Sequence, residues 1–269
     1  YLTSVQEMSR SGFYGQAAEQ MADLSLKTQS AGDLTEELSD QFILATNAAY
    51  GLGGSVKDLE SILDGANMIT NRNSVSMEDL AEGMSRAGSI SAQYGVQANQ
   101  LAALTGTAVA ATKKSGDEVG NSIKSIMVNL QNVDSSKIVS QFKKVGISMT
   151  EIVDGSERLK DPIRLLQELS DVYTSLPSGS TDKAGILTNI FGKYQANVGS
   201  AILSNMDTYK NMLQDYSEGM GSLDTESQKS ADNIQGRLNT LQNQWVQFIN
   251  NFFNKDAVKD SVSGITNIV

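Results

Sequence analysis

The sequence contains no histidine and no cysteine among its 269 residues. Their absence excludes disulfides, zinc sites built from the usual ligands, thiol nucleophiles and histidine general bases. There are only two prolines, and aromatic residues make up 6% of the chain. A core therefore has to be built from Ala, Leu, Ile, Val and Met. We expect helices that end at glycines rather than at prolines, and no cofactor.

Long apolar runs and basic stripes are also absent. No run of about 18 apolar residues is present, so we expect no membrane contact through this segment. The net charge is −10, with 15 acids and 8 bases in residues 1–133 against 16 and 13 in residues 134–269. Without a basic stripe, we expect no nucleic-acid binding, sequence-specific or otherwise. Because the sequence starts with Tyr1 and shows no signal peptide, we interpret it as a piece of a longer chain.

A regular apolar repeat stands out near the end of the chain. Large apolar residues recur there in steps of four and three, at Ile234, Leu238, Leu241, Trp245, Phe248 and Phe252. This spacing is the a/d seam of a heptad repeat, which needs another helix to cover it. The intervening residues are mostly uncharged amides, so the outer face is expected to meet protein as well.

Three interpretations of this seam stay open. It packs on other helices of the same chain, it self-associates in a trimer or another bundle, or it binds a different protein. About three heptads is short for an independent coiled coil. The seam nevertheless indicates a component of a protein assembly, and it does so more clearly than any pattern indicates a chemical activity.

The rest of the chain predicts a mainly α, multi-helix fold with glycine-punctuated helices and a long amphipathic helix toward the C-terminus. Ser55 with Asp58, and Ser76 with Asp79, have the spacing of helix-capping pairs. Pro162 suits the first turn of a helix. A small β-hairpin is predicted near residues 145–160, where the sequence is rich in turn residues.

These patterns divide the chain into four parts. Residues 1–133 form an N-terminal helical region, and residues 134–221 a second helical region with a turn-rich insert. Residues 222–254 form the heptad helix, and residues 255–269 a terminal segment. Glycine clusters and loops argue against one unbroken rod, so we expect folded-back packing. As a continuous helix, the chain would reach at most roughly 400 Å.

An ordered series of short motifs gives a more specific indication. It includes Asp64-Gly65-Ala66-Asn67, Ser76 to Ala81, Gly116 to Lys124, and Ile190-Phe191-Gly192-Lys193. In this order the motifs resemble the core region of phage tail tape measure proteins, over roughly residues 40–250. The structural positions that the resemblance indicates are Asp64, Asn67, Asp79, Leu80, Gly88, Gly95, Gly116, Gly120, Phe191 and Gly192.

The resemblance implies a non-enzymatic structural protein of a phage tail or a phage-derived particle. Members of that family lie in the tail lumen, set tail length, template tube assembly and take part in genome ejection. The implied partners are the tail tube protein, tail assembly chaperones and distal tail or baseplate hub proteins. The implied locations are the lumen of the virion tail and, during assembly, the host cytoplasm.

Two other classes of function remain as alternatives. One is a helical interaction or adhesion module of a secreted or surface protein. The other is part of a tail-associated cell-wall hydrolase, which would need two carboxyls converging across a cleft. Adjacent acids such as Glu78 and Asp79 do not face one another on a helix, so capping and solvation explain them better. A calcium loop at Asp154, Glu157 and Asp161 lacks the EF-hand spacing.

Overall fold

The structure is a computed structural model that describes residues 1–233 together with Leu238, Leu241 and Gln244. The described part is mostly helical, with one small antiparallel sheet, which confirms the predicted fold class. The predicted helix across the heptad seam lies largely outside the described residues.

The first half of the described chain is a succession of α-helices. They are α1 (Leu2–Arg10), α2 (Gln16–Gly32), α3 (Glu36–Tyr50), α4 (Val56–Arg72), α5 (Met77–Gln93), α6 (Ala98–Thr112) and α7 (Gly116–Leu130). Both predicted serine caps are present. The Ser55 side chain accepts a hydrogen bond from the Asp58 backbone N–H, and Ser76 forms a full capping box with Asp79.

The second half contains shorter elements and the sheet. They are α8 (Ser136–Lys144), β1 (Thr150–Val153), β2 (Ser156–Leu159), α9 (Pro162–Ser175), α10 (Thr181–Gly185), η1 (Ile186–Phe191), α11 (Ala196–Ser204) and α12 (Met206–Ser217). The strands pair in antiparallel register, with Thr150 opposite Leu159 and Val153 opposite Ser156. The predicted hairpin and the Pro162 helix start are therefore confirmed.

One feature of this half differs from a plain helical pattern. Residues Ile186–Phe191 form a turn of π-helix, continuous with α10. Asn189 donates a hydrogen bond to the Gln141 side chain on α8 at 3.1 Å. Gln141 is buried, with 5% of the residue exposed. The apolar spacing of residues 186–191 is typical of a helix but does not indicate this wider winding. The turn packs against α7 and α8.

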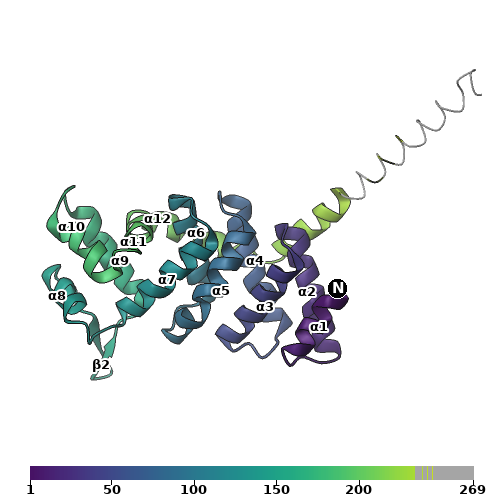
Figure 1. The fold of residues 1–269 in the computed structure, drawn as a ribbon, viewed down its shortest axis with the longest axis horizontal. Coiled ribbons are helices and arrows are strands. Elements are labelled where there is room, and N and C mark those ends of the chain that lie inside the picture. The colour runs from purple at the N-terminus through teal and green to yellow at the C-terminus, as the bar shows by residue number, and fades with distance from the viewer. Residues whose placement is uncertain (234–237, 239–240, 242–243, 245–269) are drawn as a thin grey trace, which may run out of the picture.

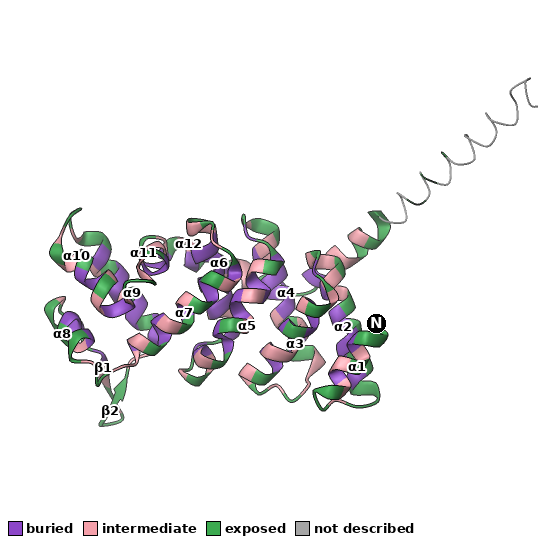
Figure 2. Cartoon of the chain, in the orientation of Figure 1, coloured by how far each residue is buried: buried purple, intermediate pink, exposed green. Residues whose placement is uncertain are grey.

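The helices lie side by side along the long axis of the molecule, with α8 and α10 at one end and α1 at the other (Figure 1). Buried residues occur in the helices along the whole length of this array (Figure 2), and their apolar members form a hydrophobic core. Helix α5 lies between α3 and α7, and α6 packs against α12 and α4. The expected folded-back packing is therefore observed.

Residues 222–233 are helical and leave the array beside α2 and α4 (Figure 1). Among the described residues, no helix is long and apolar enough to cross a membrane. The predicted boundary at residues 133–134 falls in the turn between α7 and α8, and the boundary at 221–222 falls where the last described helix begins. The division into four parts remains a prediction.

Candidate interaction site

The start of the last described helix is held by one carboxylate on α4. Asp64 accepts hydrogen bonds from the backbone N–H groups of Gly221, at 2.8 Å, and Leu223, at 2.9 Å. The two bonds satisfy donors that the first turn of a helix leaves free, and they place a negative charge at the positive end of the helix dipole. Asp64 therefore acts as a helix cap supplied from more than 150 residues away in the sequence.

Ser222 completes this contact. Its hydroxyl donates to the backbone oxygen of Asp64 at 2.7 Å and accepts from the Asn67 side chain at 3.1 Å. Ser222 is 7% exposed and the Leu223 side chain is fully buried. We call Asp64, Asn67, Ser222 and the N–H groups of Gly221 and Leu223 the α4 clamp.

The backbones also approach closely at the α4 clamp. A Cβ atom on Gly219 would lie 2.5 Å from the Asp64 backbone oxygen, and one on Gly65 would lie 2.5 Å from the Tyr216 ring. Both positions therefore require glycine. Two of the predicted structural residues, Asp64 and Asn67, thus meet a turn that the sequence did not connect with them.

Ion pairs surround the α4 clamp. Lys27 on α2 lies 2.7 Å from Asp224 and 3.0 Å from Glu60, and Arg72 lies 2.9 Å from Asp215. The hydrogen bond from Lys27 to Asp224 is the largest of the effects that raise the pKa of Lys27. These side chains are partly exposed, so we expect each pair to contribute little to stability on its own. Only the pair with Asp224 reaches the last described helix, whereas the other two join α2 and α12 to α4.

Six other predicted structural residues lie on α5 and α7 or end one of these helices. Asp79 accepts a hydrogen bond from the Gly116 N–H at 3.0 Å, and a Cβ atom on Gly116 would overlap the Asp79 backbone. A Cβ atom on Gly120 would lie 2.7 Å from the Gly83 backbone oxygen. The two helices therefore touch backbone to backbone, which explains the need for glycine at Gly116 and Gly120 of α7.

The remaining members of this group have simpler positions. Leu80 is fully buried. Gly88 faces α3, where an added Cβ would lie 3.3 Å from the Ala49 Cβ. Gly95 follows α5 with a φ of +82°, a conformation that favours glycine.

Phe191 and Gly192 lie where the π-helix ends. The Phe191 ring is fully buried, and its backbone oxygen accepts a hydrogen bond from Asn129 on α7 at 3.1 Å. A Cβ atom on Gly199 would overlap the Phe191 ring. Nothing in the sequence around Asn129 or Gly199 indicates these contacts, and only their partners in space reveal their roles.

The chain matches the family model of phage-related minor tail proteins over residues 2–192, from α1 through η1. The chain belongs to this family. The match includes all ten of the predicted structural positions and ends before Ser222. No solved structure matches the chain.

Membership makes this phage tail protein a component of the virion tail. It confirms the coarser part of the predicted resemblance, a phage tail structural protein. The family description does not specify a tape measure role, so length control and genome ejection belong to the proposal below.

The acidic residues of the tail protein's turn-rich insert do not converge. Asp161 caps α9 by accepting from the Ile163 N–H at 2.7 Å, and Glu157 accepts from the Thr150 hydroxyl at 2.7 Å. Asp154 lies in the hairpin turn with a φ of +52°. Within the described residues, no group of three acids has the arrangement of a metal site. The calcium-loop alternative gains no support.

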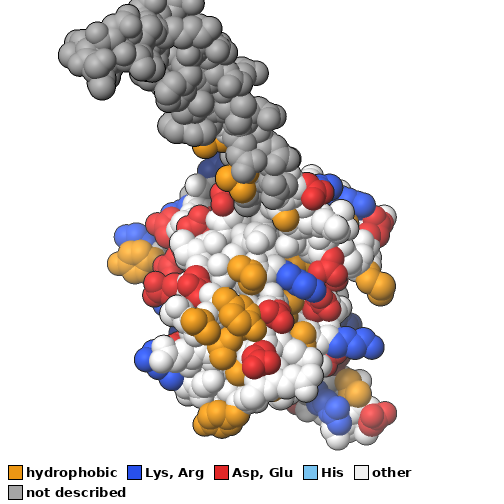
Figure 3. Space-filling model, turned by 90° about the vertical axis from the view of Figure 1, so that its right-hand side faces the viewer, with side chains coloured by type: hydrophobic (Ala, Val, Ile, Leu, Met, Phe, Trp, Pro, Cys, Tyr) orange, Lys and Arg blue, Asp and Glu red, His pale blue; other side chains and the backbone are white. Residues whose placement is uncertain are grey.

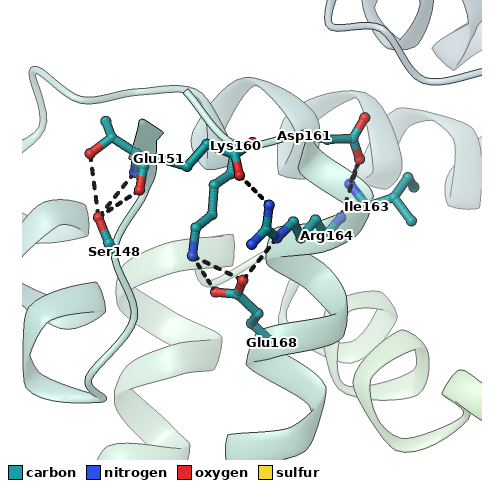
Figure 4. Close-up of polar contacts among 8 residues, drawn as sticks. Ser148, Glu151, Lys160, Asp161, Ile163, Arg164 and Glu168 are labelled. Carbon is teal, nitrogen blue, oxygen red and sulfur yellow. Dashed lines mark hydrogen bonds and ion pairs between the residues drawn. The ribbon is translucent and has the colours of Figure 1, made fainter. Parts of the chain in front are cut away.

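A compensated cluster of charges ties this hairpin to α9 (Figure 4). Lys160 Nζ lies 2.7 Å and 2.9 Å from the two carboxylate oxygens of Glu168, and its side chain is 11% exposed. Arg164 bridges Glu168, at 3.3 Å, and Glu151 on β1. Two acids thus meet two bases. The cluster fastens the hairpin and presents no free carboxyl pair of the kind a hydrolase uses.

Only two residues of the predicted heptad seam are described. Leu238 is 52% exposed and Leu241 is 68% exposed, so no described part of the chain covers them fully. Ile234, Trp245, Phe248 and Phe252 lie outside the described residues. What covers the seam therefore remains a prediction.

Proposed function

We propose that this chain is a segment of a tail tape measure protein, which sets tail length, templates assembly of the tail tube and takes part in genome ejection. The family membership and the ordered motifs between Asp64 and Lys193 support this function. The proposed partners are the tail tube protein, tail assembly chaperones and distal tail or baseplate hub proteins. The segment acts in the tail lumen, and in the host cytoplasm during assembly, without enzymatic activity.

The observation that carries the proposal is the α4 clamp. It joins a folded helical array to a helix that leaves the array in a fixed direction. A component that spans part of a tube needs such a transition between a folded end and an extended rod. At about 1.5 Å per residue, a rod is the most economical way to fill length.

Tail length tests this function directly. An in-frame duplication of residues 234–269 in the full-length protein should lengthen the tails, by up to about 1.5 Å per added residue if the added segment is helical. Electron microscopy of intact particles measures the change. Tails that assemble at the parent length would contradict length control. As a control, a duplication of the β1–β2 hairpin, residues 150–159, should leave the length unchanged because it adds to a side of the array.

We further propose that the heptad seam associates with copies of itself. The exposure of Leu238 and Leu241 supports this interpretation over packing within the chain. Leu241→Asp should lower the molecular mass measured in solution, because a charge in an a/d seam is strongly disfavoured. Gln244→Asp adds the same charge beside the seam, on an exposed residue, and should leave the mass unchanged. If the mass of Leu241→Asp also stays at the parent value, the seam does not join copies.

A further inference from the structure

We propose that the α4 clamp opens and closes as a unit, so that the last described helix, residues 222–233, swings away while the array stays folded. This helix is buried against the array in its first turn alone. Ser222 is 7% exposed and Leu223 is fully buried, whereas none of residues 224–233 is buried. Opening the α4 clamp therefore uncovers only one buried apolar side chain of the helix.

The polar contacts of this helix with the array are confined to the same turn. Within the described residues, the hydrogen bonds and the ion pair that join the helix to the array all lie at residues 221–224. Asp64 accepts two of the bonds, and Lys27 pairs with Asp224 at 2.7 Å. Contacts that share four consecutive residues and one acceptor form a connected network. We expect such a network to break and form together.

The chain has a pivot directly before the helix. Met220 is 95% exposed, and Gly221 has a φ of +76°. Glycine changes its backbone conformation at lower steric cost than other residues, and hinges consist of a few residues that absorb such changes. Gly219 lies against the Asp64 backbone oxygen, so the pivot begins after it. A rotation at residues 220–221 turns the helix without moving α12.

Helix α12 has its own contacts with the array, which an open α4 clamp leaves in place. It packs against α6 and α4, and Tyr209 and Met212 on its inner face are each 1% exposed. Asp215, near its end, lies 2.9 Å from Arg72 on α4. None of these contacts involves residues 221–224. The packing of the array therefore does not depend on the position of the last described helix.

Figure 3 shows the end of the molecule from which this helix leaves. A group of apolar side chains lies exposed there among acidic ones, yet the helix is not buried against that surface beyond Leu223. The role of the movement rests on the proposed function. An array and a rod that share one tube have to come into line with it, and a closed α4 clamp fixes the angle between them whereas an open one frees it.

Native-state hydrogen exchange in low urea tests whether the α4 clamp opens separately from the array. We expect the amides of Gly221 and Leu223 to have protection factors at least about tenfold below those of α5. Their dependence on urea should also be weaker, since opening the α4 clamp exposes little surface. Equal protection factors with equal urea dependence would overturn the proposal, because the helix and the array would then unfold together.

Two variants should give opposite patterns of exchange. Leu223→Ala removes the apolar side chain that the closed α4 clamp buries, so it should lower the protection of the Gly221 amide by about tenfold. Ile123→Val is the control, because it removes one methylene from a fully buried side chain on α7. It destabilises the closed and open forms equally. Protection in α5 should therefore fall by about threefold or more, while that of the Leu223 amide changes by less than about twofold.

Either variant can contradict the proposal. Equal losses of protection at the Leu223 amide and in α5 of Ile123→Val would show that the α4 clamp opens only when the array unfolds. Failure of Leu223→Ala to fold would show that the array depends on the α4 clamp.

The swing itself is measured as the distance between two spin labels, which the absence of cysteine allows to be placed singly. Gln20→Cys on α2 and Gln228→Cys on the last described helix put the labels at exposed positions. Dilution with unlabelled chains restricts the measurement to distances within one chain. We expect one narrow distance with Asp64 present and a broad distribution in Asp64→Ala. Asp58→Ala, which removes an exposed carboxylate from the same helix, should keep the narrow distance.

A narrow distribution at the parent distance in Asp64→Ala would overturn the proposal, because something other than the α4 clamp would then hold the helix. These measurements use the isolated chain and do not depend on tail length. Tails of parent length in the duplication experiment would therefore remove the role of the movement in the tail and leave the opening of the α4 clamp in place.

Discussion

The Asp64 carboxylate on α4 and the backbone N–H of Leu223 are 2.9 Å apart, although 159 residues separate them in the sequence. This bond closes the helical array, because it joins an early helix to the helix that leaves the body. Together with the bond to Gly221, it gives the last described helix its cap and its direction.

Removing the cap should cost more than removing an ordinary surface charge. Asp64→Ala leaves two backbone donors without their charged acceptor, and we expect it to lower the free energy of unfolding by about 2–3 kcal/mol. Asp58→Ala removes an exposed carboxylate in the first turn of the same helix and should cost under about 1 kcal/mol. Urea denaturation measures both. Equal costs for the two variants would show that the α4 clamp contributes nothing of its own.

The crossing of α5 and α7 predicts an unusual response to alanine. Replacing a glycine inside a helix with alanine normally raises the free energy of unfolding by up to about 1 kcal/mol. At Gly120 the new Cβ would meet the Gly83 backbone oxygen, which cannot move aside as a side chain can. We expect Gly120→Ala to destabilise the protein by about 1–3 kcal/mol instead.

Gly88→Ala on α5 is the control for this prediction. Its new Cβ would meet only the Ala49 Cβ, at 3.3 Å, so its effect should stay within about 1 kcal/mol. Shifts of the urea midpoint at constant slope separate the two variants. A Gly120→Ala protein as stable as the parent would mean that the helices do not pack this closely.

Asp40 predicts a pH dependence with a definite sign. Because its pKa is raised in the folded state, the folded protein binds more protons at this site than the unfolded chain does. Stability should therefore fall as the pH rises from the ordinary pKa of 3.8 through the raised value. At neutral pH, Asp40→Asn should be more stable than the parent, since it removes a buried charge.

The difference in stability between the parent protein and Asp40→Asn isolates the pH dependence that Asp40 causes, because the other carboxylates are common to both proteins. Thermal midpoints recorded from neutral pH down to the ordinary pKa of aspartate should converge as the pH falls. A parent protein more stable than Asp40→Asn at neutral pH would show that the carboxylate has a stabilising partner within the chain.

The hairpin cluster predicts a local effect. Lys160→Ala removes the nearly buried partner of Glu168, whereas Arg164 still contacts that carboxylate. We expect a loss of about 1 kcal/mol, mostly in the hairpin. Faster hydrogen exchange in β1 and β2, with unchanged exchange in α5, would be the signature. Uniform acceleration throughout the molecule would assign Lys160 to global stability instead.

Local features of the fold were predictable from sequence because their causes are local. Ser76 and Asp79 cap the same helix turn, Pro162 fixes a helix start, and turn residues place the hairpin. The α4 clamp was not predictable, since nothing in the sequence around Ser222 indicates Asp64. The same holds for Gly83 against Gly120 and for Asn189 against Gln141, which only tertiary packing brings together. The apolar spacing in residues 186–191 likewise predicts a helix without indicating its π winding.

The site was predictable only in part for the same reason. The resemblance indicated Asp64 and Asn67 as structural positions, but their partners lie on a helix beyond the family match. The sequence does not indicate that Asp40 is buried, because a buried carboxylate and an exposed one look alike in a sequence of this composition.

Electron microscopy of intact particles that contain a gold-labelled version of the full-length protein tests the central claim most directly. A tail component of the proposed kind predicts label within the tail and continuous helical density in its lumen. Label confined to the capsid or the outer tail surface, with a lumen that lacks this density, would contradict the account.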